Sequence, residues 1–296
     1  MVIYSSFSPN QTYQMKRLSF LFALLVSSYA GYSQSCCGVG KADCRPDDMQ
    51  LMASTKEFQK AHIAPLPYTH VSMYGGEMIT FPTPDGQKAN AYIIRAIKPT
   101  NKYLFVYQEW WGLNDHIKKQ ADIFYKDLES VNVIAIDMYD GKIATSADSA
   151  GKYMSTANPV RLQSIIQGAL SFVGPKAKIA SVGWCFGGGL SLKSALLEGK
   201  QAVGCVMYYG MPEKDVAKLA TLKCDVLGLF ASREKWISTA VVNEFEANMK
   251  TAKKKLTVKS FDAEHAFANP SNPNFDKAAT DEAYQLAITY LKAKLK

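Results

Sequence analysis

Apolar and polar residues alternate in short blocks between residues 68 and 97. We predict three strands there, at residues 68–74, 77–82 and 89–97. The intervening Gly75-Gly76 and Thr83-Pro84-Asp85-Gly86 are typical of hairpin turns, so these strands should be antiparallel. Residues 45–66 lack this periodicity and are predicted to be an irregular lead-in.

From residue 102 onward, strands and helices alternate. Continuous apolar runs are typical of strands buried on both faces, and they occur at residues 103–107, 131–138, from Lys178, 203–208, 225–230 and 256–261. Helices are predicted between them, at residues 114–129, from Pro159, after residue 185, at 239–250 and from about residue 275. This alternation predicts an α/β fold with a mostly parallel central sheet and helices on both faces. No linker interrupts it, so residues 67–296 are predicted to form one domain.

The segment Gly183-Trp184-Cys185-Phe186-Gly187 follows one of these apolar runs and precedes a helix. Its Gly-x-nucleophile-x-Gly spacing in a strand–turn–helix context is that of a nucleophile elbow. The flanking glycines permit a strained turn, and the N-terminus of the following helix favours a thiolate and an oxyanion. The alternative is a buried structural cysteine beside chance glycines. We expect Cys185 to be the nucleophile.

A cysteine nucleophile needs a base and an acid that orients it. In α/β-hydrolases the order along the chain is nucleophile, acid, histidine. His265 is the only histidine after Cys185, and it follows the last predicted strand. Glu234 is the only carboxylate of residues 231–236, the loop after the strand at 225–230. The alternatives are an exposed loop histidine and a solvated charged turn.

Glu109 is a further candidate because it stands at the end of an apolar strand, beside Trp110 and Trp111. A carboxylate that tryptophans shield from water should have a raised pKa, which suits proton exchange with a thiol. The alternative is a carboxylate that caps the following helix. The same loop supplies the second oxyanion-hole N–H group in this class of fold.

Taken together, these segments resemble the dienelactone hydrolase family of α/β-hydrolases over residues 70–295. The motifs that carry the resemblance are Gln108-Glu109-Trp110-Trp111-Gly112, Gly183-Trp184-Cys185-Phe186-Gly187-Gly188, the loop 230–236 and His265-Ala266-Phe267-Ala268-Asn269-Pro270. The resemblance implies the α/β-hydrolase fold and a carboxymethylenebutenolidase-like carboxylic ester hydrolase.

The resemblance also implies roles for individual residues. It implies a triad of Cys185, Glu234 and His265, with Glu109 pairing with the resting thiol and accepting its proton when substrate arrives. The oxyanion hole would consist of the backbone N–H groups of Phe186 and Trp110.

The chain departs from the family pattern at several positions. The usual triad aspartate is Glu234 here, and the two arginines that hold the substrate carboxylate in dienelactone-cleaving members are absent. Asp140-Gly141-Lys142 and Asn269 stand at those places, which disfavours dienelactone as the substrate. An aromatic pocket is predicted from Trp111, Tyr139, Trp236 and Phe267. The alternative for each aromatic is core packing.

Residues 1–30 have the order of a secretory signal peptide. Lys16 and Arg17 precede the apolar stretch 18–26, and small residues lead to a possible cleavage after Ala30. Met15 is the better start. We therefore predict a secreted or periplasmic protein with no stable membrane insertion after cleavage. A buried hairpin in a cytosolic protein and a lipoprotein anchored through Cys36 are less favoured alternatives.

The chain contains six cysteines. Cys36, Cys37 and Cys44 lie in the irregular segment 31–66, where we expect local disulfides, with a soft metal as the alternative. Cys205 and Cys224 lie on or beside apolar strands and are predicted to be buried core thiols.

The net charge of 34 − 26 = +8 is spread along the chain, apart from Lys253-Lys254-Lys255. This distribution predicts a solvated surface and no nucleic-acid partner. The expected activity is cleavage of a small ester or lactone through a thioester on Cys185, without a metal or organic cofactor. A thioesterase or acyl transferase and a non-catalytic binding protein on the same scaffold are the alternatives. The sequence does not predict the oligomeric state.

Overall fold

The computed structural model describes residues 48–296, and all structural statements below refer to this part of the chain. The predicted signal peptide of residues 1–30 and the cysteines Cys36, Cys37 and Cys44 lie outside the described residues, so the expectations about them stay predictions.

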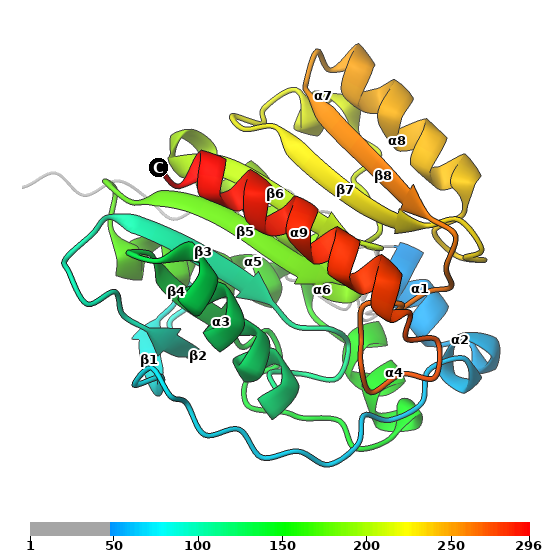
Figure 1. Ribbon diagram of the computed structural model, residues 1–296, viewed down its shortest axis with the longest axis horizontal. Helices are drawn as coiled ribbons and strands as arrows, with labels where there is room; N and C mark the ends of the chain where they lie inside the picture. Colours follow the sequence, from blue (N-terminus) through cyan, green and yellow to red (C-terminus); the bar gives the residue numbers. More distant parts are fainter. Residues whose placement is uncertain (1–47) are drawn as a thin grey trace, which may run out of the picture. The chain divides into compact units, whose positions relative to one another are not determined.

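An eight-stranded sheet with the order β1-β2-β4-β3-β5-β6-β7-β8 forms the centre of the fold (Figure 1). Its strands are β1 (Glu77–Pro82), β2 (Lys88–Ile94), β3 (Lys102–Tyr107), β4 (Asn132–Ile136), β5 (Lys178–Trp184), β6 (Ala202–Tyr208), β7 (Val226–Ala231) and β8 (Leu256–Phe261). β2 pairs antiparallel with both β1 and β4, and the remaining pairs are parallel. The mostly parallel sheet predicted from the sequence is therefore confirmed, and its topology is that of an α/β-hydrolase.

Helices cover both faces of this sheet. They are α3 (Asp115–Leu128), α4 (Ala147–Ser155), α5 (Pro159–Val173), α6 (Phe186–Glu198), α7 (Val216–Leu219), α8 (Thr239–Thr251) and α9 (Lys277–Lys294), with a 3-10 turn at Gly199–Gln201. α3 and α9 lie side by side on the face turned toward the viewer in Figure 1, whereas α5 and α6 lie together on the other face. No described helix is long and apolar enough to cross a bilayer.

The register of the central strands brings their carboxyl ends to one edge. Tyr107, the last residue of β3, pairs with Gly183 near the end of β5, and Trp184 pairs with Tyr208 at the end of β6. The loops that begin at Gln108 and Cys185 therefore emerge next to each other. In open α/β sheets this edge is where functional side chains gather.

The predicted strand at 68–74 is wrong. This stretch runs along α3 without joining the sheet, and side chains bind its polar groups: the His70 N–H donates to Asp115 Oδ2 at 3.0 Å, and the Ser72 hydroxyl donates to Asp122 Oδ2 at 2.8 Å. The apolar residues that suggested a strand, Val71 and Met73, are 80% and 87% exposed. The alternation of apolar and polar residues suggested a buried face, but no buried surface lies next to these side chains.

The irregular lead-in predicted for residues 45–66 is also wrong in part, because it contains the short helices α1 (Asp48–Ala53) and α2 (Lys56–Lys60). Thr55 caps α2 by accepting a hydrogen bond from the Phe58 N–H at 3.3 Å. α1 packs against α4, a helix that was not predicted. Gly151 of α4 allows this close contact, since a Cβ there would lie 2.7 Å from the Ala53 carbonyl oxygen.

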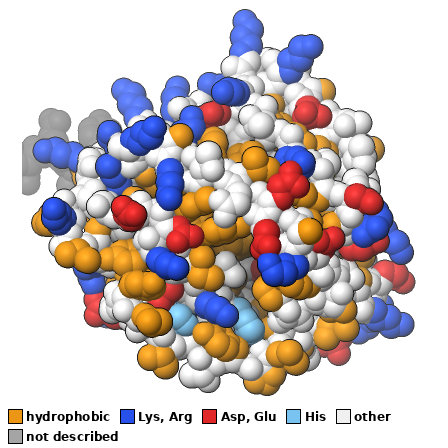
Figure 2. Space-filling model, in the orientation of Figure 1, with side chains coloured by type: hydrophobic (Ala, Val, Ile, Leu, Met, Phe, Trp, Pro, Cys, Tyr) orange, Lys and Arg blue, Asp and Glu red, His pale blue; other side chains and the backbone are white. Residues whose placement is uncertain are grey.

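Basic side chains occur over much of the face shown in Figure 2. On the face in Figure 2, Lys and Arg side chains are interspersed with acidic and apolar ones. Several form ion pairs, such as that of Arg161 with Asp85 at 3.0 Å and with Asp140 at 2.5 Å. This arrangement agrees with the solvated surface expected from the sequence.

Candidate active site

Cys185 lies in the turn between β5 and α6 and has a φ of 55° and a ψ of −120°. A positive φ is strained for a residue with a side chain and is typical of a nucleophile elbow. A Cβ on Gly183 would lie 2.0 Å from the Gly187 carbonyl oxygen, and one on Gly187 would lie 2.4 Å from the carbonyl oxygens of Tyr107 and Gln108. Both glycines are thus required for the turn to pack against β3.

His265 and Glu234 come from the loops after β8 and β7, and they meet beside the elbow. His265 Nδ1 lies 2.6 Å from Glu234 Oε1, and both side chains are buried. Glu234 Oε1 also accepts the Ile237 N–H at 3.2 Å, which fixes the carboxylate. Burial opposes a charged ring, but the carboxylate of Glu234 and the nearby Cys185 raise the pKa of His265 well above its usual value. The glutamate therefore reaches the histidine despite its extra methylene.

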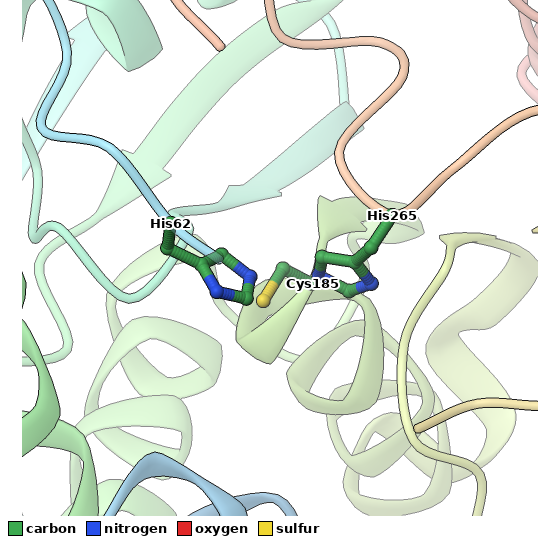
Figure 3. Close-up of side chains that lie close together, drawn as sticks. All are labelled: His62, Cys185 and His265. Atoms are coloured by element: carbon green, nitrogen blue, oxygen red, sulfur yellow. The ribbon is translucent and has the colours of Figure 1, made fainter. Parts of the chain in front are cut away.

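A third side chain joins Cys185 and His265. The Sγ atom of Cys185 and ring nitrogens of His62 and His265 all lie within 4.8 Å of one another (Figure 3). Burial raises the pKa of the Cys185 thiol, whereas the charge of His265 and the N–H of Phe186 oppose this increase. Cys185 is consequently a thiol at rest that loses its proton only when another group accepts it.

His62 was not among the residues predicted to act at this site. It follows α2, and its Nδ1 lies 2.6 Å from the Phe58 carbonyl oxygen, so Nδ1 donates the hydrogen and Nε2 carries the lone pair. Burial and, to a lesser extent, the charge on His265 together lower the pKa of His62 to about 3, against the opposing hydrogen bond to the Phe58 carbonyl oxygen. The spacing of Phe58 and His62, four residues apart at the end of a short helix, was the one signal in the sequence that could have indicated a shared face.

Cys185 is only 2% exposed, and aromatic side chains gather around the histidine rings next to its sulfur. The Phe58 ring stacks on His62 with centroids 4.1 Å apart and meets Trp110 and Trp236 edge-on at 5.1 and 4.9 Å. The predicted pocket residue Trp236 is therefore part of this aromatic group.

Glu109 is buried close enough to Cys185 for its charge to act on the thiol. Burial raises the pKa of Glu109 to about 7, although the charge of His265 and a hydrogen bond from Asn269 both lower it. Asn269 Nδ2 donates to Glu109 Oε2 at 2.7 Å. Glu109 in turn raises the pKa of Cys185 by its charge. The predicted pairing of Glu109 with the thiol stays a prediction, since the hydrogen bond found for this carboxylate comes from Asn269.

The two amides predicted to form the oxyanion hole lie at suitable places. Phe186 is the first residue of α6, so its N–H has no carbonyl partner within the helix, and it faces the Cys185 sulfur. Trp110 follows β3 and makes no hydrogen bond through its N–H to a backbone carbonyl of the described loops. The oxyanion hole that they would form stays a prediction.

A cavity of about 180 Å³ lies next to Glu109. Trp111, one of the predicted pocket residues, lines it together with Asn269 and Trp184. The other two predicted pocket residues pack elsewhere: the Tyr139 ring stacks on Phe186 at 5.7 Å, and Phe267 is fully buried against Tyr209 and Phe261. Only Trp111 of the four is thus placed on this cavity.

Cys205 and Cys224 lie away from the site. Cys205 is fully buried on β6, as predicted, while Cys224 is only partly buried. Burial raises the pKa of the Cys205 thiol to about 12. Both are free thiols.

Comparisons with known proteins agree with this geometry. The sequence model of the Dienelactone hydrolase family matches residues 89–295. A protein of Aquifex aeolicus (strain VF5) with the name "Putative carboxymethylenebutenolidase" is 27% identical over an alignment of 233 residues that covers 75% of this chain and 100% of that protein.

Solved structures show the same fold. A dienelactone hydrolase-like promiscuous phosphotriesterase from metagenomic libraries has a TM-score of 0.65 at 18% identity, covering 75% of this chain and 99% of the other. The dienelactone hydrolase from Anabaena variabilis ATCC 29413 has a TM-score of 0.55 at 17% identity, covering 75% and 98%. His62 precedes the residues that the family model matches.

Proposed function

The chain belongs to the dienelactone hydrolase family, and we propose that it hydrolyses a small carboxylic ester or lactone through a thioester on Cys185. One observation carries the proposal: the strained Cys185 has its sulfur within 4.8 Å of a ring nitrogen of His265, whose Nδ1 is held by Glu234. This is the arrangement of nucleophile, base and orienting acid that acyl transfer requires.

Acylation begins when the thiol loses its proton. Glu109, with a pKa of about 7, is partly ionised at neutral pH and accepts this proton. The thiolate attacks the carbonyl carbon, and the N–H groups of Phe186 and Trp110 stabilise the oxyanion. His265, protonated at Nε2, donates that proton to the departing alkoxide as the C–O bond breaks.

Deacylation restores the resting state. Neutral His265 removes a proton from water, and the hydroxide attacks the thioester carbonyl. The C–S bond then breaks, the acid leaves, and the thiolate recovers its proton from Glu109. The hydrogen bond of His265 Nδ1 to Glu234 keeps the ring oriented through both halves and stabilises its charged form.

The lining of the cavity next to Glu109 supports a substrate with an apolar group. The space of about 180 Å³ is lined by Trp111 and Glu109, while Cys185 and His265 are not among its lining residues. Asn269 binds Glu109 at a position where dienelactone-cleaving relatives are expected to hold a substrate carboxylate. This favours an uncharged ester or lactone over dienelactone.

Acylation of the protein by p-nitrophenyl acetate tests the proposal. The wild type should release a burst of p-nitrophenol and carry an acetyl group on Cys185 in mass spectra, while Cys185→Ala should show neither. Cys224→Ser is the matched control and should behave as the wild type. Equal behaviour of wild type and Cys185→Ala would favour the non-catalytic binding protein, and preference for long acyl thioesters would favour a thioesterase.

Export of the protein is a separate proposal that rests on the signal-like order of residues 16–30. N-terminal sequencing of the purified natural protein tests it. A mature N-terminus near Gly31 is expected, whereas an intact residue 16 would overturn the export proposal.

A further inference from the structure

The cluster of His62, Cys185 and His265 carries an inference beyond hydrolysis. We propose that these three side chains form a binding site for a thiophilic divalent cation of the Zn²⁺ class, and that the bound ion reversibly blocks the nucleophile. The proposed inhibition rests on the proposed function, whereas metal binding itself can be measured without it.

Donor chemistry is the first support. Two imidazole nitrogens and one thiolate are the ligands that Zn²⁺ prefers, and three protein ligands leave a fourth position for water. The three donor atoms already lie within 4.8 Å of one another. Tetrahedral zinc with bonds of about 2.0–2.3 Å separates its ligand atoms by about 3.5 Å, so the donor atoms must approach one another by about 1.3 Å at most.

The Nε2 atom of His62 is a buried polar atom without a hydrogen-bond partner among the described residues, whereas His265 interacts with the thiol of Cys185. His62 is 5% and His265 is 3% exposed, so neither nitrogen is compensated by bulk water. A buried acceptor without a partner is costly, and the lone pair of His62 beside the Cys185–His265 pair indicates that a ligand belongs there. Histidines with a purely structural role would not need ring nitrogens directed toward the sulfur of Cys185.

The outer contacts of both rings are those of metal-binding histidines. His265 Nδ1 is 2.6 Å from Glu234, and His62 Nδ1 is 2.6 Å from the Phe58 carbonyl oxygen. Ligating histidines almost always donate their second N–H group to a carboxylate or a backbone carbonyl, because this fixes the tautomer and the ring orientation. Each ring therefore has its second-sphere partner already in place and directs Nε2 toward the site.

Binding displaces protons and blocks catalysis. The ion replaces the thiol hydrogen of Cys185 and the Nε2 hydrogen of His265, and these protons pass to Glu109 or to solvent. A sulfur bonded to the ion is no longer free to attack a carbonyl, and His265 cannot donate to a leaving group. His62 lies outside the matched family region, so this third ligand is an addition of the chain's N-terminal segment.

Titration of the full chain with Zn²⁺ and with Co²⁺ tests the site. The background is the triple variant Cys36→Ser, Cys37→Ser, Cys44→Ser, which removes the other cysteine cluster. We expect one ion per chain, a thiolate-to-cobalt charge-transfer band, and loss of both in Cys185→Ala. His62→Gln and Glu234→Gln should each weaken zinc binding about tenfold or more.

Matched controls are His116→Gln and Cys224→Ser, which should bind zinc as the background does. Circular dichroism melts identify variants that fail to fold, and Cys185→Ser provides a second, nearly isosteric test of the thiolate. Absence of binding in the background, or binding that neither Cys185 nor His62 substitution weakens, would overturn the proposed site.

Esterase assays separate this inference from the proposed function. Zinc should suppress the wild-type rate at least about tenfold, and a chelator should restore it. Zinc binding without any esterase activity in the metal-free protein would overturn the hydrolase proposal alone. Full activity of the zinc-loaded protein, or activity only with zinc, would overturn the inhibitory role.

Discussion

Asn269 donates a hydrogen bond from Nδ2 to Oε2 of Glu109 at 2.7 Å. This bond opposes burial, which raises the pKa of Glu109 to about 7. A hydrogen bond to the charged form favours ionisation, so Asn269 holds the carboxylate near the point where it can exchange a proton at neutral pH. The residue that replaces an expected substrate-binding arginine thus sets the protonation of the site.

Replacing Asn269 by Ala should raise the pKa of Glu109 further, because only the opposing hydrogen bond is lost. Ionised Glu109 accepts the thiol proton, so activity rises with pH through the pKa of this group. We expect the acidic limb of kcat/KM against pH to move to higher pH in Asn269→Ala, by about one unit.

Ser271→Ala is the control for this shift. It removes a hydroxyl that donates to Asn269 Oδ1 at 2.7 Å but leaves the bond to Glu109. Its acidic limb should stay close to that of the wild type. An unchanged limb in Asn269→Ala would contradict the role of Glu109 as proton acceptor.

Glu234 should be essential for rate and its charge should matter more than its length. Glu234→Gln keeps the shape but removes the carboxylate that orients His265 and stabilises its charge, so kcat should fall on the order of 10²–10⁴-fold. Glu234→Asp retains the charge and should recover part of the rate. Steady-state hydrolysis of p-nitrophenyl acetate measures both, and equal rates for the two variants would argue that the 2.6 Å bond is only structural.

Phe58 should control access to the sulfur. Its side chain is fully buried, and a Phe→Ala substitution in a core lowers the free energy of unfolding by about 3–5 kcal/mol. In Phe58→Ala this loss should destabilise the short helix α2. The segment should open more often, and iodoacetamide should alkylate Cys185 at least about tenfold faster in Phe58→Ala. Peptide mass spectrometry measures this at the individual cysteine.

Phe172→Ala is the matched control. It removes the same kind of side chain at a position on α5 that is 43% exposed and distant in sequence from Phe58. Its labelling rate should equal that of the wild type. If Phe58→Ala also labels at the wild-type rate, another segment controls access to Cys185.

The sheet and the elbow could be predicted because their signals are local. β5 shows its apolar run in a few residues, and the glycines around Cys185 act within one turn. His265 and Glu234 followed from the order of elements, since each loop begins where a predicted strand ends. These features need no knowledge of distant contacts.

His62 and the helices around it could not be predicted in the same way. α1 and α2 are too short to be stable alone, and α1 is held by contacts such as Gln50 Nε2 with the Ala157 carbonyl oxygen at 2.7 Å, 107 residues away. Val71 and Met73 gave the opposite error, because their alternation indicated a buried face that does not exist. Long-range packing decided both cases.

Glu198 gives the fold a pH dependence that is independent of catalysis. It is buried at the end of α6, accepts the Ser194 hydroxyl at 2.7 Å, and burial raises its pKa from 4.5 to about 8. The folded protein therefore binds more protons than the unfolded chain between these values. Stability is fully present below pH 4.5 and falls as pH rises to about 8, by a few kcal/mol from this group. Denaturant unfolding at several pH values measures this decline in the free energy of unfolding, which Glu198→Gln should lack. The control Glu246→Gln changes an exposed glutamate and should retain the decline. If the free energy of unfolding falls equally with pH in the wild type and both variants, Glu198 is not its source.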